Sequence, residues 1–139
     1  MDNPLQSIKL FAIAVIAAVL VFGGVAVFLN KIGHVPVAAG FDPIIGYAGI
    51  IIAAACIAIS FLVYKRRSEA AGNANDNEKL SLFRSAVIVQ FALVDAPAIF
   101  NVIAYLLGGN NQSLVMVACC IVVLFVQFPT EERYNRFGE

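Results

Sequence analysis

Four long apolar segments dominate the sequence and limit what the chain can fold into. The first, residues 8–29, carries no charged residue after Lys9. At about 1.5 Å per residue, a helix of this length crosses the roughly 30 Å hydrocarbon core of a bilayer. The 139-residue chain is 61% hydrophobic and 13% charged, whereas soluble domains are about 45–50% apolar and about 25% charged. A soluble fold of this size has too little interior to hide the excess, so we expect lipid to cover it.

The predicted fold is all-α, an integral membrane four-helix bundle forming one domain over residues 1–139. Only helices and closed barrels satisfy their backbone hydrogen bonds in lipid, and these segments are too long and continuously apolar for barrel strands. The expected spans are residues 8–29, 44–64, 82–107 and 113–128, with a flexible polar loop at 65–80.

Lysine and arginine gather in the loop at 65–80 and its flanks and in the tail that follows residue 128. Positively charged short loops favour the cytoplasmic side of a membrane. We therefore predict that the N and C termini are cytoplasmic, with a multi-pass topology in a bacterial inner (cytoplasmic) membrane.

Several local signals predict where helices begin and end. Asp42 followed by a proline is typical of a helix start, and Ser81 is a possible cap for the third helix. Residues 108–111 (Gly-Gly-Asn-Asn) predict a tight turn. The tail is expected to form a brief surface helix, with Tyr134 and Phe137 facing the membrane.

The second segment is rich in small residues at helical spacing. Small residues four apart let helix backbones approach closely in lipid. We therefore predict that this segment is the central packing helix of the bundle. The residues expected to make the close contacts are Gly46, Gly49, Ala53, Ala54 and Ala58.

The third segment carries an acid, Asp95, near its middle. Twelve Leu, Ile, Val or Phe residues lie within 87–107, and they supply roughly −4 to −7 kcal/mol against about +2.5 to +3.5 for a central Asp, so the helix inserts. Pro97 removes one backbone N–H and predicts a kink. Asn101 lies four residues later and is placed to donate to the Pro97 carbonyl, while Gln90 adds a further polar side chain.

An ionisable side chain at mid-membrane is a functional-site hypothesis by default. The sequence offers no cation at the same depth, so we expect Asp95 to be protonated and to donate a hydrogen bond. Three roles remain open. The favoured one is a polar contact that holds helices together, within the chain or between copies. The others are proton or ion handling at Asp95 and binding of a small lipid-soluble partner.

Signals for an enzyme are missing from the sequence. We find no Ser-His-Asp set, metal-ligand cluster or phosphate-binding loop, so we predict no catalytic residue, no metal and no cofactor. Cys56, Cys119 and Cys120 lie in apolar runs and are expected to be packing residues, and the single histidine, His34, lies in a connection. The zero net charge gives no indication of a nucleic-acid partner. The expected partners are the lipid bilayer and either further copies of the chain or a larger membrane complex.

Residues 92–100 (Ala-Leu-Val-Asp-Ala-Pro-Ala-Ile-Phe) resemble the carboxylate helix of rotary ATP synthase c subunits, the proteolipids. Those helices read Ala-Leu-x-Glu/Asp-Ala, and the resemblance implies that Asp95 occupies the position that binds the translocated proton or sodium ion. The Arg-Gln-Pro loop motif and the glycine ladder of that family are not found here. The overall pattern also resembles small four-span bacterial membrane proteins that carry an acid-alanine-proline motif.

Two functions follow from these observations. The first is a non-enzymatic structural or accessory membrane subunit, in which a buried, protonated Asp95 holds helices together. The second is a proton- or sodium-coupled subunit similar to a proteolipid, in which Asp95 exchanges the ion.

Overall fold

The computed structural model describes residues 4–33 and 43–139, and every regular element within these ranges is a helix. The first three helices have 28, 29 and 33 residues, and each is long and apolar enough to cross a membrane. The fourth has 16 residues and is apolar but shorter. The all-α prediction is confirmed. The elements are α1 (Pro4–Lys31), α2 (Pro43–Ala71), α3 (Asp76–Gly108), α4 (Asn111–Val126) and α5 (Glu131–Asn135).

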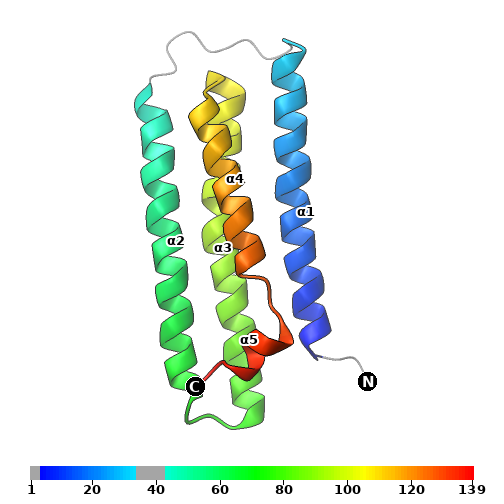
Figure 1. The fold of residues 1–139 in the computed structure, drawn as a ribbon, viewed down its shortest axis with the longest axis vertical. Coiled ribbons are helices and arrows are strands. Elements are labelled where there is room, and N and C mark those ends of the chain that lie inside the picture. Colours follow the sequence, from blue (N-terminus) through cyan, green and yellow to red (C-terminus); the bar gives the residue numbers. More distant parts are fainter. Residues whose placement is uncertain (1–3, 34–42) are drawn as a thin grey trace.

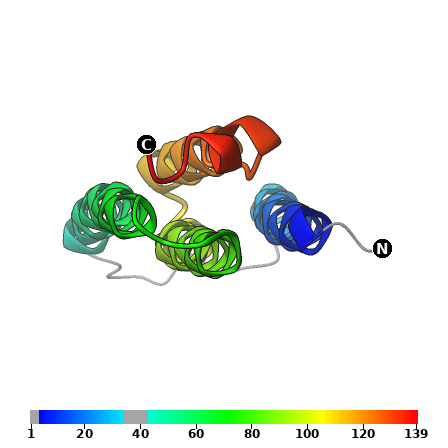
Figure 2. The ribbon, with the colours of Figure 1, turned by 90° about the horizontal axis from the view of Figure 1, so that it is seen from below.

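Helix α3 lies at the centre of the arrangement and packs against α1, α2 and α4 (Figure 2). Half of its most apolar stretch is buried, against 22% in α1 and in α2. The prediction that the second segment would be central is therefore wrong. Most of the largest fully buried side chains belong to α3, including Phe83 and Phe91. The small residues of α2 allow α2 to approach α3 from one side.

The polar stretch at residues 65–80 is mostly helical, in contrast to the predicted flexible loop. Helix α2 continues to Ala71 and α3 begins at Asp76. Lys, Arg, Glu and Ala are good helix formers, which explains why the charged residues after 64 extend α2. Asn75 caps α3, accepting a hydrogen bond from the Glu78 N–H while the Glu78 side chain accepts from the Asn75 N–H. Ser81 lies inside α3 and does not cap it.

The turn between α3 and α4 agrees with its sequence signal. Gly109 adopts a left-handed conformation with φ of 64°, which favours glycine. Asn110 then caps α4 by accepting from the Gln112 N–H. The predicted start signal at Asp42 and the connection that holds His34 lie outside the described residues.

The beginning of α1, the turn between α2 and α3, and α5 lie at one end of the molecule, which we call the α5 end (Figure 1). The short α5 helix was predicted, but the placement of Phe137 in the membrane is wrong. Its side chain is 1% exposed and lies edge-on to the rings of Tyr64 and Phe83, with centroids 5.3 and 5.2 Å away. Tyr134 packs on the same Phe83 ring at 5.3 Å. These ring contacts account for the burial of Phe137.

Candidate functional site

The three polar side chains of α3 face three different neighbours. Because each helical residue turns about 100°, steps of five and six residues rotate the side chain by about 140° and 240°. Asn101 contacts α2, Gln90 contacts the segment after α4, and Asp95 lines a groove beside α1. Gln90 and Asn101 are fully buried, whereas Asp95 is half-buried.

Asn101 fastens α3 to α2. Its side-chain amide donates to the Pro97 carbonyl at 2.8 Å, as the four-residue spacing predicts, and to the Gly49 carbonyl at 3.3 Å. A Cβ atom on Gly49 would lie 2.6 Å from the Asn101 Oδ1, so this crossing requires glycine. Helix α3 continues without interruption through Pro97.

The other small residues of α2 divide between two faces. A Cβ atom on Gly46 would lie 2.9 Å from the Asn110 side chain, and Ala53 is fully buried. Ala54 and Ala58 are exposed. The one-residue step from Ala53 to Ala54 turns the side chain about 100° away from α3.

Gln90 accepts a hydrogen bond from Arg133, a residue that the sequence did not mark as part of a site. The Arg133 Nη2 donates to the Gln90 Oε1 at 3.0 Å, and Nη1 donates to the Gln127 carbonyl. The guanidinium also lies over the Tyr64 ring, 4.4 Å from its centroid. Arg133 thus joins α2, α3 and the segment after α4. Its only sequence signal is its place in a short tail that also carries two aromatic residues.

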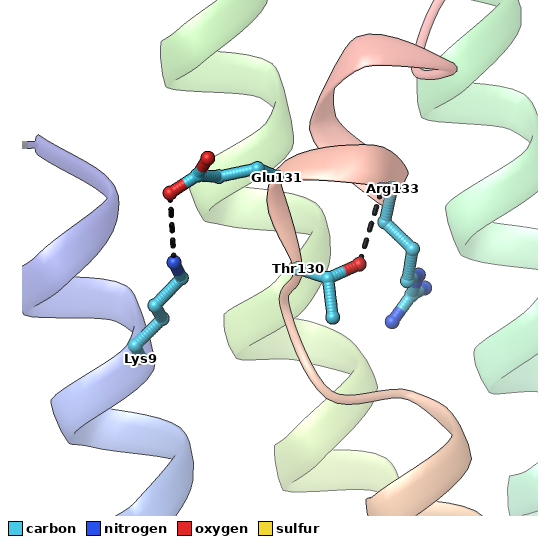
Figure 3. A network of polar contacts seen from close by, with 4 residues as sticks. All are labelled: Lys9, Thr130, Glu131 and Arg133. Carbon is cyan, nitrogen blue, oxygen red and sulfur yellow. Dashed lines mark hydrogen bonds and ion pairs between the residues drawn. The ribbon is translucent and has the colours of Figure 1, made fainter.

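The polar contacts at the α5 end extend outward from Arg133. The Gln127 Nε2 donates to the Ser60 Oγ at 2.9 Å. At the N-cap of α5, the Thr130 Oγ1 accepts from the Arg133 N–H at 3.2 Å, and Glu131 of α5 forms an ion pair with Lys9 of α1 at 3.2 Å (Figure 3). All four long helices are therefore held at this end.

Asp95 lies in a groove between α1 and α3, and the prediction that it is buried is wrong. The groove encloses about 410 Å³ and is lined by side chains of both helices. It is open at the side, because Phe11, Phe22 and Ile99 are 39%, 44% and 38% exposed. Asp95 is only half-buried because α1 covers only part of the adjacent face of α3. The full lining consists of Phe11, Ala14, Val15, Ala18, Val19, Phe22, Asp95 and Ile99.

The Asp95 carboxyl has no hydrogen bond or ion pair with any residue in 4–33 or 43–139. The other seven lining residues are apolar. The expected hydrogen bond from Asp95 to a neighbouring helix is therefore not formed within the described part of the chain. This groove is the candidate functional site, because it holds a polar group whose partner the described chain does not supply.

The described residues offer few groups for metal binding or thiol chemistry. They contain no group of three or more His, Cys, Asp or Glu side chains close enough to share a metal ion. Cys56, Cys119 and Cys120 are free thiols, and Cys119 is exposed where packing was expected. Comparison of the chain with protein-family models, curated proteins and solved structures found no match.

Proposed function

We propose that the chain is a non-enzymatic accessory subunit of a membrane complex, and that the groove holding Asp95 is where a helix of a partner chain docks. The observation that carries the proposal is the position of Asp95. A polar group in lipid normally faces a bundle interior or a partner. Asp95 lies in an open apolar groove without a partner in the described chain. The sequence left open a polar contact within the chain or between copies, and a contact between chains accounts for this position better than one within the chain.

The charge distribution supports a four-span topology with the α5 end in the cytoplasm. Eight of the nine lysines and arginines belong to the start of α1, the α2–α3 hairpin end and α5, and the ninth is Lys31 at the other end of α1. This asymmetry is typical of cytoplasmic ends. A thiol-specific reagent that does not cross membranes tests it. A cysteine at exposed Asn73 should be labelled only after the membrane is opened, and one at Gln112 should be labelled in intact cells. The reverse pattern would refute the topology.

Photocrosslinking tests the docking role. A photoreactive residue at Ala18, in the groove, should give a discrete protein adduct in native membranes, and Asp95→Leu should remove it. The matched control is the same photoreactive residue at Ile59, exposed on α2 far from the groove, which should give lipid adducts. Only lipid adducts from both positions, or a protein adduct at Ala18 that persists in Asp95→Leu, would argue against the proposal.

A second candidate is the ion-coupled subunit, and the open side of the groove favours it, because Asp95 is not enclosed by its own chain and is accessible to a proton pathway on a neighbouring subunit. A sodium site is less well supported. Hard cations take several oxygen ligands, and Asp95 is the only lining side chain that carries oxygen. Carbodiimide should therefore modify Asp95 at a rate that sodium does not change. Protection by sodium would favour the ion-coupled function instead.

A further inference from the structure

The groove is formed by two matched stripes of side chains. Phe11, Ala14, Ala18 and Phe22 follow one face of α1 at helical spacing, and Asp95 and Ile99 are four apart on α3. The two alanines lie between the two phenylalanines, so the α1 side chains that line the middle of the groove are small. Small residues at this spacing allow another helix to approach closely. Asp95 is level with this middle section, which is also the middle of α1 (Pro4–Lys31).

The described chain has no cation that could serve the carboxyl. Lys9 forms its ion pair with Glu131. Arg84 is exposed and lies eleven residues before Asp95, about 16 Å along the helix axis. Arg133 is engaged by Gln90, Gln127 and the Tyr64 ring. Whether the Asp95 carboxyl is charged or protonated, its partner must therefore come from another molecule.

A second copy of the chain does not supply the missing group. Its lysines and arginines also lie near helix ends or in α5, and at the depth of Asp95 it would bring another acid. Two carboxylates in one low-dielectric site cannot both be ionised, because like charges repel. A lysine or arginine lets Asp95 keep its charge in lipid, where ionisable side chains pair with one another. Charge complementarity therefore selects a different protein.

From these observations we infer that the groove receives a transmembrane helix of a different protein that carries a lysine or arginine at mid-membrane depth, paired with Asp95. This inference rests on the proposed docking function and specifies its partner. The ammonium or guanidinium contacts the carboxylate, while the apolar stripe on either side of the basic residue packs against Phe11 and Phe22. The alanines of α1 provide the room for the approach.

A synthetic transmembrane peptide of leucine and alanine with one central lysine is the direct probe. Binding is measured by energy transfer between the labelled peptide and the purified full chain in phosphatidylcholine vesicles. The matched peptide has leucine in place of lysine. The lysine peptide should bind about three- to twentyfold more tightly, the range expected for polar contacts between membrane helices. Asp95→Asn keeps the size of the side chain but removes the charge, and it should abolish the preference.

Further variants separate the inference from the proposed function. Ala18→Leu fills the groove while Asp95 stays unmutated, and it should weaken binding of both peptides. Ile103→Leu lies on an exposed part of α3 outside the groove lining, and it should change the binding of neither peptide. Equal binding of the two peptides, or a preference that survives Asp95→Asn, would overturn the inference. After either of these outcomes, the docking function still stands if the Ala18 crosslink in native membranes requires Asp95. An adduct of twice the chain's mass, a second copy, would likewise overturn only the inference.

Discussion

Two regions of the molecule, the α5 end and the middle of α1, are built differently. At the α5 end, aromatic rings, the Arg133 guanidinium and an ion pair join the helices. In the middle of α1, the groove at Asp95 is open, apolar and without a polar contact among the described residues. At the α5 end the Arg133 guanidinium and the Gln90 Oε1 have partners within this chain, whereas the carboxyl in the groove has none among the described residues. The difference separates a region that stabilises the fold from one that is available to another molecule.

The largest effect should come from removing the ring at the centre of the α5 end. Phe137→Ala empties a site that is 1% exposed, and it should lower the free energy of unfolding by about 3 kcal/mol. Phe125→Ala, at a residue 57% exposed on α4, is the matched control and should change little. Unfolding in mixed detergent and SDS measures both. Equal losses in the two variants would contradict the closed packing described for the α5 end.

The next largest effect should follow from widening the crossing between α2 and α3. Gly49→Ala places a Cβ atom 2.6 Å from the Asn101 Oδ1, and overpacking of this kind should cost about 1–3 kcal/mol. The control is Gly24→Ala on α1, where no neighbouring heavy atom lies within 4 Å of the added Cβ. The same unfolding assay should show no loss for this control. A stable Gly49→Ala variant would mean that the helices at this crossing can separate at little cost.

Arg133 should give a smaller loss than Gly49 or Phe137. Arg133→Ala leaves the Gln90 Oε1 buried without its donor, which should cost about 1–2 kcal/mol. Arg136→Ala removes an arginine three residues away that pairs only with exposed Glu132, and it should cost under about 0.5 kcal/mol. Arg133→Lys should be intermediate, because one ammonium cannot reach both acceptors and stack on Tyr64. Equal effects for Arg133→Ala and Arg136→Ala would show that the buried polar contact is unimportant.

The smallest effect on folding is expected at Asp95. Asp95→Leu should leave the free energy of unfolding of the isolated chain unchanged or raise it slightly, because no hydrogen bond is lost and an apolar groove gains an apolar side chain. Asp95→Asn serves as the size-matched comparison. A loss of about 1 kcal/mol or more in Asp95→Leu would favour a contact within one chain, one of the two alternatives that the sequence left open.

The sequence predicted the features that depend on local chemistry. Apolar segment length gave the helices, Gly109 marked the turn, and the spacing of Pro97 and Asn101 gave their hydrogen bond. The capping box at Asn75 and Glu78 was also readable, but the charged residues after Tyr64 were interpreted as a loop in spite of their helix propensity.

The features that depend on how helices are placed around α3 were not predictable. Helical periodicity gives the angle between Gln90, Asp95 and Asn101, but not which neighbour lies in each direction. The position of α1 beside Asp95 depends on tertiary packing that its uniformly apolar sequence does not specify. The burial of Phe137 and the role of Arg133 depend in the same way on where the tail returns to the helices.

The Asn101 contact has a consequence for the biosynthesis of the chain. Helix α3 is the least hydropathic of the three longest helices, and Asp95 reduces its margin for insertion. The acceptor for Asn101 is the Gly49 carbonyl, which is synthesised earlier, whereas the donor for Gln90 is Arg133, which emerges later. Chain order therefore favours α3 leaving the translocon alongside α2, where the Gly49 carbonyl is already available to Asn101. The α5 end is completed later, once Arg133 has been synthesised.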